Sequence, residues 1–266
     1  MSEYLDFAVE TAREAGAILR AEFDRPKEIS YKGEVDIVTE SDRRSEALIV
    51  SRIQKRYRSH AIVAEEGGVG SAAAAGANFC WHVDPIDGTT NFAHGYPCFA
   101  VSIGLAQDGV PVAGVVFNPV SDELFTAARG EGAYLNGQRI HVSPIEKLAV
   151  SLVATGFPTH QRKRSANMNY YWEFTLRSHG VRRDGSAALD LCAVAAGRFD
   201  AYWEFGLKSW DAAAGALLVE EAGGMVTDLT GGAYRLGGPH VLATNGRIHR
   251  EMQEVAAIAE RGAARS

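Results

Sequence analysis

The sequence is poor in cysteine and has no long apolar run. Its three cysteines, Cys80, Cys98 and Cys192, are widely spaced and odd in number, which fits neither a disulfide framework nor a paired metal site. No apolar stretch reaches the roughly 18 residues of a membrane-spanning helix. The N-terminus carries acidic residues where a secretory signal would carry basic ones. These absences predict a cytoplasmic protein with reduced cysteines and no membrane contact.

Blocks of like charge and several catalytic motifs are also missing. The chain has 27 basic and 33 acidic residues, a net charge of −6 and no run of five like charges, so nucleic acid is not an expected partner. It contains no Gly-x-x-x-x-Gly-Lys-Ser/Thr loop, no Gly-x-Ser-x-Gly elbow and no His-Glu-x-x-His motif. P-loop, covalent serine and zinc chemistries therefore lack support.

Apolar periodicity divides the chain into two patterns, with a predicted boundary near residue 145. Residues 1–145 predict an α+β half with helices at about 3–24 and 42–57, the second capped by Ser41, and a largely antiparallel sheet. Residues 146–266 alternate strands and helices, which is typical of α/β layering. An exposed loop is expected at 67–77, and a polar helix without an assigned role within 159–178.

The most informative segment is residues 84–91, Asp-Pro-Ile-Asp-Gly-Thr-Thr-Asn. Two carboxylates stand three positions apart around a stiff proline bend, and oxygen ligands of this kind bind hard divalent cations such as Mg²⁺. The Gly-Thr-Thr that follows can open a helix whose N–H groups face an anion. A metal site and an anion site within eight residues predict chemistry on a phosphate ester.

Further acidic residues stand at expected strand ends or helix starts. Each has an ordinary interpretation: Glu65-Glu66 before two glycines is typical of a solvated turn, and Asp42 or Asp211 of the first turn of a helix. Together they match what two neighbouring metals need, which is one shared carboxylate with others on either side. Asp84 is the natural bridge, with Glu65 on one metal and Asp87 and Asp211 on the other.

Ordered motifs along almost the whole chain resemble the inositol monophosphatase family, which is magnesium-dependent and lithium-sensitive. The resemblance implies a five-layered αβαβα sandwich with a largely antiparallel first sheet and a mixed second sheet. It also implies two or three Mg²⁺ ions per active site and a homodimer. The motifs are 35–42, Glu65-Glu66, 81–92, 184–191, 204–208 and 210–215.

The same resemblance implies a role for each matching residue. The first metal would be bound by Glu65, Asp84, Thr89 and the carbonyl of Ile86, the second by Asp84, Asp87 and Asp211, and a third, weaker one by Glu65. Thr89 paired with Asp42 would orient the attacking water, and Gly88 and Thr89 would hold the phosphate. On the substrate side would lie Gly185, Ala187 and Glu204. Glu66 would orient other groups, and Lys32 would add positive charge.

The expected reaction is hydrolysis of myo-inositol 1-phosphate or a similar polyol phosphate by water. Related enzymes acting on histidinol phosphate, fructose 1,6-bisphosphate or NADP are the alternatives, together with a non-catalytic binding protein on the same fold. Glu204 favours the inositol branch because a carboxylate suits a neutral polyol and repels a second phosphate. The complete set of expected metal ligands argues against the binding protein.

Overall fold

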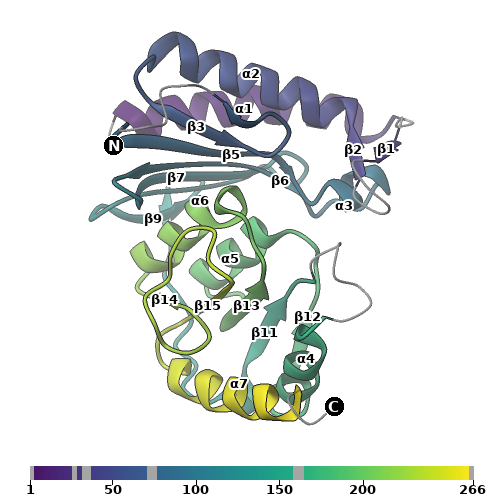
Figure 1. Ribbon diagram of the computed structural model, residues 1–266, viewed down its shortest axis with the longest axis vertical. Helices are drawn as coiled ribbons and strands as arrows, with labels where there is room; N and C mark the ends of the chain where they lie inside the picture. The colour runs from purple at the N-terminus through teal and green to yellow at the C-terminus, as the bar shows by residue number, and fades with distance from the viewer. Residues whose placement is uncertain (1–2, 26–28, 32–36, 71–76, 158–164, 264–266) are drawn as a thin grey trace.

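The computed structural model describes residues 3–25, 29–31, 37–70, 77–157 and 165–263. Within these ranges, three helical layers alternate with two large sheets (Figure 1). The order is the helix pair α1 and α2, the first sheet, the pair α5 and α6, the second sheet, and the pair α4 and α7. This arrangement confirms the predicted αβαβα sandwich.

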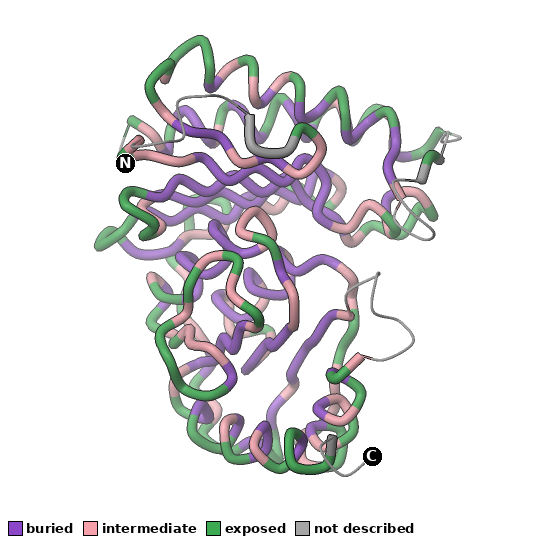
Figure 2. The backbone as a smooth tube through the Cα atoms, in the orientation of Figure 1, coloured by how far each residue is buried: buried purple, intermediate pink, exposed green. Residues whose placement is uncertain are grey.

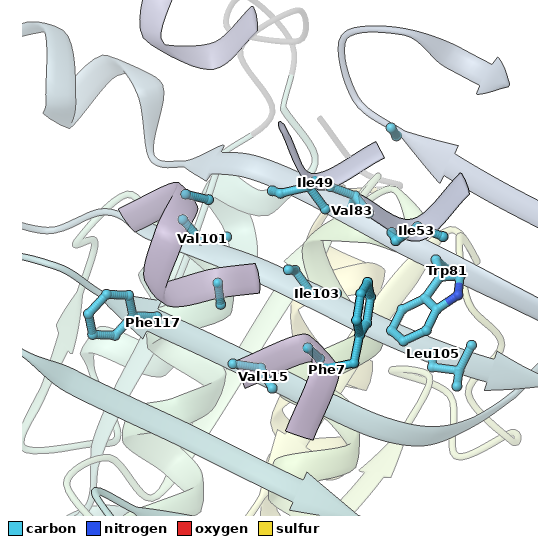
Figure 3. Close-up of a cluster of buried hydrophobic side chains, with 14 of the residues drawn as sticks. Phe7, Ile49, Ile53, Trp81, Val83, Val101, Ile103, Leu105, Val115 and Phe117 are labelled. Atoms are coloured by element: carbon cyan, nitrogen blue, oxygen red, sulfur yellow. The ribbon is translucent and has the colours of Figure 1, made fainter. Parts of the chain in front are cut away.

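The outer helices α1 (Glu3–Phe23) and α2 (Glu40–Arg56) bury their apolar sides against the first sheet. Figure 3 shows Phe7 and Ile53 beside Trp81, one of the largest fully buried side chains, and Ile49 beside Val83. The expected cap of the second helix is wrong. Helix α2 begins after Thr39, which shares two hydrogen bonds with the Asp42 carboxylate, at 2.7 Å from its backbone nitrogen and 2.6 Å from its hydroxyl.

The first sheet has eight strands in the order β10-β9-β8-β7-β6-β5-β3-β4, and all its ladders are antiparallel except β3 with β5. Its strands are β3 (Ala61–Ala64), β4 (Gly68–Gly70), β5 (Phe79–Asp87), β6 (Ala100–Gln107), β7 (Val110–Asn118), β8 (Glu123–Ala128), β9 (Gly132–Leu135) and β10 (Gln138–Arg139). Strand β4 corrects the expected loop at 67–77, of which 71–76 lie outside the described residues. A separate ladder joins β1 (Ile29–Tyr31) and β2 (Ile37–Thr39).

The middle helices α5 (Ala187–Ala195) and α6 (Ser209–Glu221) lie between the two sheets. Residues 212–219 of α6 are all buried, as expected for a helix covered on every side. It approaches the first sheet closely at the cross-strand pair Gly104 and Gly114. A Cβ on Gly104 would lie 2.7 Å from the Ala213 Cβ, and one on Gly114 would lie 2.9 Å from the Ala214 Cα. Glycine at both positions therefore sets the depth of α6.

The second sheet is mixed, as predicted, because β11 runs parallel to β12 and β13 while the remaining ladders are antiparallel. Its strands, in spatial order, are β12 (Gly180–Arg182), β11 (Leu152–Thr155), β13 (Ala201–Phe205), β15 (His240–Thr244) and β14 (Met225–Thr227). Its outer face is covered by α4 (Asn167–Thr175) and α7 (His249–Ala263). Helix α4 accounts for part of the segment 159–178.

Burial follows these layers, with the strands and middle helices buried and the outer helix faces and loops exposed (Figure 2). Two short helices complete the fold, α3 (Thr89–Ala93) and η1 (Leu148–Val150). The chain passes from the first sheet to the second between β10 and η1; the division at residue 145 stays a prediction. No helix in the described ranges is both long and apolar enough to cross a membrane.

Candidate active site

Strand β5 continues through the Asp-Pro-Ile-Asp segment and places both of its carboxylates. The ladder with β6 shifts register between Asp84 and Asp87, which is a bulge of the kind that re-aims side chains. Asp84 is only 2% exposed, and its Oδ1 accepts a 3.0 Å hydrogen bond from the Ile86 backbone nitrogen. The bulge thus fixes two buried carboxylates at the end of one central strand.

The turn after β5 depends on Gly88. Its φ of 97° lies in the left-handed region, and a Cβ there would come 2.9 Å from the Cys98 carbonyl oxygen. Helix α3 begins at the next residue, Thr89, whose hydroxyl lies 3.0 Å from Asp42 Oδ1 and 2.9 Å from the Ile86 carbonyl oxygen. Asp42 is fully buried. The structure therefore brings together Thr89 and Asp42, the pair predicted to orient water.

Asp87 joins the two halves of the chain. Its carboxylate accepts hydrogen bonds from the Ser186 hydroxyl at 2.5 Å, from the Ala188 nitrogen at 2.6 Å and from the Ala187 nitrogen at 3.3 Å. These donors form the N-terminus of α5, where a negative charge is favoured. Ala187, predicted on the substrate side, therefore also binds a predicted metal ligand through its backbone.

Asp211 reaches the site from the first turn of α6. Its Oδ2 accepts a 2.7 Å hydrogen bond from the Lys208 nitrogen, which completes a capping arrangement at the start of the helix. The neighbouring Ser209 hydroxyl lies 2.9 Å from His82 Nδ1 on β5. Burial lowers the pKa of His82 to about 4, so this histidine stays neutral. These contacts lock the α6 N-terminus against β5.

Glu65 follows β3 and lies beside β5. Its backbone nitrogen donates to the Val83 carbonyl oxygen at 3.3 Å, which places it next to the start of the Asp-Pro-Ile-Asp segment. The Glu66 nitrogen donates to Glu46 Oε2 at 2.7 Å, and a Cβ on Gly67 would lie 2.9 Å from Glu46 Oε1. Glu46, a buried residue of α2 that the sequence motifs did not single out, thus holds the turn that carries Glu65.

These elements surround a cavity of about 460 Å³. Asp84 and Asp42 are not in its lining and lie behind the wall. Its lining includes eight residues predicted for the site, namely Glu65, Asp87, Gly88, Thr89, Gly185, Ala187, Glu204 and Asp211, together with Arg183, Asp190 and Lys208.

The carboxylates at this wall oppose one another electrostatically. Burial raises the pKa of Asp84 well above its ordinary value, and repulsion from Glu65, Asp87 and Asp211 raises it further. Burial, with the charge of Asp87, also raises the pKa of Asp211. For Asp87, burial raises the pKa to about 6 against the opposing effect of its three donors. Such a cluster of mutually repelling acids is stabilised by a cation.

The donor set fits Mg²⁺ in its chemistry, since hard divalent cations take carboxylate, hydroxyl and carbonyl oxygens. In the part of the chain that the structure describes, no three acidic, histidine or cysteine side chains already form a closed metal-binding group. Hydrogen bonds explain why these carboxylates do not converge on one point, because the Asp87 carboxylate is directed toward α5 and the Asp211 carboxylate toward the Lys208 nitrogen. The mutual repulsion of the carboxylates requires that Asp84, Asp87, Asp211 and Glu65 lie within electrostatic reach of one another.

The opposite wall of the cavity is built around Glu204 on β13. This residue is 8% exposed, and one of its carboxylate oxygens accepts a short hydrogen bond from the Tyr202 hydroxyl. Burial raises the pKa of Glu204 to about 7, although the bond from Tyr202 opposes the shift. A Cβ on Gly156 would lie 2.0 Å from Glu204 Oε2, so only glycine leaves room for this carboxylate.

Asn167 braces this wall from α4. Its Nδ2 donates to the Gly156 carbonyl oxygen at 2.6 Å and to Thr155 Oγ1 at 2.9 Å, and its Oδ1 accepts from Trp203 Nε1 at 2.6 Å. The side chain is fully buried, so these bonds satisfy a polar group that burial would otherwise penalise. Helix α4 therefore supports the wall around Glu204, a role that its sequence did not indicate; residues 159–164 lie outside the described residues.

A comparison along the whole chain decides the family. The model of the inositol monophosphatase family matches residues 1–262. The chain belongs to this family. "Nus factor SuhB" of Pseudomonas aeruginosa is 46% identical over 257 residues that cover 95% of both chains. "Inositol-1-monophosphatase" of Synechocystis sp. is 45% identical over 261 residues, which are 97% of this chain and 90% of the relative.

Solved structures of the inositol monophosphatase family agree with this assignment. The crystal structure of extragenic suppressor protein suhB from Bartonella henselae matches with a TM-score of 0.90 at 39% identity, covering 96% of this chain and 98% of that chain. The resemblance drawn from the motifs is thus confirmed. The chain is a phosphoric monoester hydrolase of the inositol monophosphatase type.

Within this phosphatase, Glu66 joins Asp42, Asp84 and Ile86 as predicted residues that do not line the main cavity. It lines a second cavity, of about 370 Å³, between α2 and β3. Lys32 lies outside the described residues. Glu46, Gly156 and Asn167 were missed, because each acts through contacts between distant segments. Asp190 lies in the motif 184–191, but the motif assigned it no role.

Proposed function

We propose that the protein hydrolyses a phosphate monoester with Mg²⁺, and that its substrate is myo-inositol 1-phosphate. The supporting observation is the cavity itself. A repelling carboxylate cluster of Glu65, Asp84, Asp87 and Asp211 adjoins the Gly88-Thr89 turn, and Glu204 lies on the far wall. A phosphate at the first wall would direct its alcohol toward the second.

Each residue near the phosphate has a task that its contacts support. Glu65, Asp84, Asp87 and Asp211 would hold two Mg²⁺ ions, with the Ile86 carbonyl and the Thr89 hydroxyl as further oxygen ligands and Glu65 serving a weaker third ion. Bound Mg²⁺ would supply Lewis-acid polarisation of the phosphate and acidify the attacking water.

The pair of Thr89 and Asp42 would position that water and take up its proton. Asp42 Oδ2 is occupied by two bonds from Thr39, which leaves Oδ1 directed at the Thr89 hydroxyl. When Thr89 donates to Asp42, its oxygen is free to accept a hydrogen bond from the water. Because phosphoryl transfer depends mainly on positioning and charge stabilisation, no protein nucleophile is required.

Glu204 favours a neutral polyol over the enzymatic alternatives. A buried carboxylate on the wall facing the alcohol binds hydroxyl groups and repels the second phosphate of fructose 1,6-bisphosphate or the further phosphates of NADP. We further propose that the enzyme is a cytoplasmic homodimer. The exposed apolar side chains of Met168 and Trp172 on α4, and of Leu176 at its C-cap, are spaced four residues apart and support the dimer.

The test is phosphate release from a panel of monoesters, with Mg²⁺ and with a chelator. The panel contains myo-inositol 1-phosphate, histidinol phosphate, fructose 1,6-bisphosphate, NADP and phenyl phosphate, compared by kcat/KM. We expect turnover only with Mg²⁺ and the highest kcat/KM on myo-inositol 1-phosphate. Absence of metal-dependent release from every ester would favour a binding protein on the same fold.

A further inference from the structure

Asp190 differs from every other buried acidic side chain in the described residues. It lies in the first turn of α5, is 2% exposed and borders the main cavity. No described residue donates a hydrogen bond to its carboxylate. The other six buried acidic residues each accept at least one such bond, and they are Asp42, Glu46, Asp84, Asp87, Asp200 and Glu204.

A buried carboxyl group without a protein donor is costly unless water or a ligand supplies one, and the carboxylate oxygens of Asp190 keep contact with the cavity from which such a donor can come. The charged neighbours of Asp190 do not remove this cost. Asp184, Glu204 and Asp87 carry like charge, and Arg183, which also lines the cavity, is a compensating cation that offsets only part of their effect. The unused hydrogen-bonding capacity of Asp190 therefore faces the space where a ligand would bind.

Glu204 is the second carboxylate on this part of the cavity. Its bond from Tyr202 uses one oxygen, so the other can accept a hydrogen bond from a ligand. Asp190 and Glu204 lie within electrostatic reach of one another, because the charge of Glu204 raises the pKa of Asp190. The charges of both residues also raise the pKa of their shared neighbour, Tyr202. Two acceptors near one another match a leaving alcohol with at least two hydroxyl groups.

We propose that Asp190 is a specificity-determining residue that accepts hydrogen bonds from hydroxyl groups of the leaving alcohol, alongside Glu204. This inference rests on the proposed hydrolysis of a phosphate monoester and adds a second residue that would bind the hydroxyl groups of its alcohol. An ester whose alcohol lacks hydroxyl groups would leave Asp190 unpaired in the closed complex. Sites of this kind discriminate strongly, because the analogue without the hydroxyl leaves a buried polar group without a partner.

The test compares two substrates and two variants. Myo-inositol 1-phosphate offers hydroxyl groups and phenyl phosphate offers none. In Asp190→Ala, kcat/KM for myo-inositol 1-phosphate should fall ~10-fold or more, the effect of losing a hydrogen bond to a charged group, while that for phenyl phosphate changes less than about twofold. Asp190→Asn should recover part of the loss, since its amide oxygen still accepts. The control Asp108→Asn, in an exposed turn, should leave both substrates unaffected.

Two further measurements on the variants distinguish a loss of substrate binding from a loss of folding. Thermal unfolding of each variant tests the fold, and the nearly isosteric Asp190→Asn guards against collapse of the Ala variant. Calorimetry measures the affinity for myo-inositol 1-phosphate without turnover, and this affinity should fall in Asp190→Ala. Equal losses on both substrates, or no loss on either, would overturn the role of Asp190.

The hydrolase proposal and the proposed role of Asp190 can be refuted independently of each other. If wild-type protein with Mg²⁺ releases phosphate from neither ester, the hydrolase proposal is wrong, and calorimetry alone then decides the role of Asp190. Unchanged or undetectable affinity for myo-inositol 1-phosphate in wild type and variant alike would reject the role.

Discussion

At the scale of single residues, the site is a set of buried carboxylates that differ in what they bind. Asp87 is held by three donors of α5, Asp211 by the Lys208 nitrogen, and Glu204 by the Tyr202 hydroxyl. Burial raises the pKa of each of them. Burying these charges costs free energy, and the binding of a cation and a polar substrate would offset that cost.

Glu204 should make the stability of the chelated protein depend on pH. Its pKa is raised from 4.5 to about 7, so its contribution is fully present below about pH 4.5 and is lost as the pH rises through 7. Glu204→Gln keeps an acceptor for Tyr202 and removes this loss. We expect it to exceed wild type by up to about 3 kcal/mol in free energy of unfolding at pH 8, and by much less at pH 5.

Urea unfolding at the two pH values, in the presence of a chelator, measures this difference. An equal gain at pH 5 and pH 8, or a variant less stable than wild type at pH 8, would contradict the assigned shift at Glu204.

Gly156 should affect kcat/KM on myo-inositol 1-phosphate only through its contact with Glu204. Its added Cβ would overlap the Glu204 carboxylate, so Gly156→Ala must displace that side chain. We expect kcat/KM on myo-inositol 1-phosphate to fall ~10-fold or more, as in Glu204→Ala. In a double-mutant cycle, Gly156→Ala combined with Glu204→Ala should be no worse than Glu204→Ala alone. Additive losses would show that Gly156 acts by another route.

At the scale of elements, the site is where strand ends and helix starts meet. Strand β5 brings Asp84 and Asp87, α6 brings Asp211, and the turn after β3 brings Glu65. Helix α6 can reach this position because the glycine pair of β6 and β7 lets it lie directly on the sheet. The distance between α6 and the sheet therefore controls the distance between Asp211 and the other carboxylates.

Substituting one glycine of this pair tests that control. Gly114→Ala would bring a methyl group against the Ala214 backbone, and overpacking of this kind costs about 1–3 kcal/mol of stability. We also expect the Mg²⁺ concentration for half-maximal activity to rise as Asp211 shifts. Gly262→Ala, in α7 with open space around it, is the control and should not lower stability. Unchanged stability and Mg²⁺ dependence in Gly114→Ala would contradict close packing at α6.

At the scale of the whole molecule, local patterns predicted the layers better than the contacts between them. Apolar periodicity located α1 to within one residue and α2 to within two, because such signals lie within one segment. Thr39 displaced Ser41 as the cap of α2, and β4 replaced part of a loop, because their partners lie in tertiary structure. The motifs likewise indicated the predicted ligands but not Glu46 or Asn167, whose roles depend on segments about 20 and 36 residues away.

The quaternary proposal belongs to the same scale. Trp172 is 63% exposed between Met168 of α4 and the C-cap residue Leu176, which are also exposed, whereas Val110 is 50% exposed at the start of β7, away from that row. If α4 forms the dimer contact, Trp172→Asp should convert the dimer to a monomer in sedimentation equilibrium, and Val110→Asp should not. A wild-type monomer, or a Trp172→Asp variant that remains dimeric, would refute the assignment of α4.

The central claim is that the carboxylate cluster around Asp84 binds the cations of a phosphatase. Asp84→Asn nearly preserves its shape and removes one charge from the middle of the cluster, so the matched variant Asp108→Asn controls for the chemical change. The decisive measurement is phosphate release from myo-inositol 1-phosphate across a Mg²⁺ titration. The account predicts that wild type and Asp108→Asn are activated alike while Asp84→Asn loses at least ~100-fold in kcat at every Mg²⁺ concentration. Activity of Asp84→Asn close to that of wild type would contradict it.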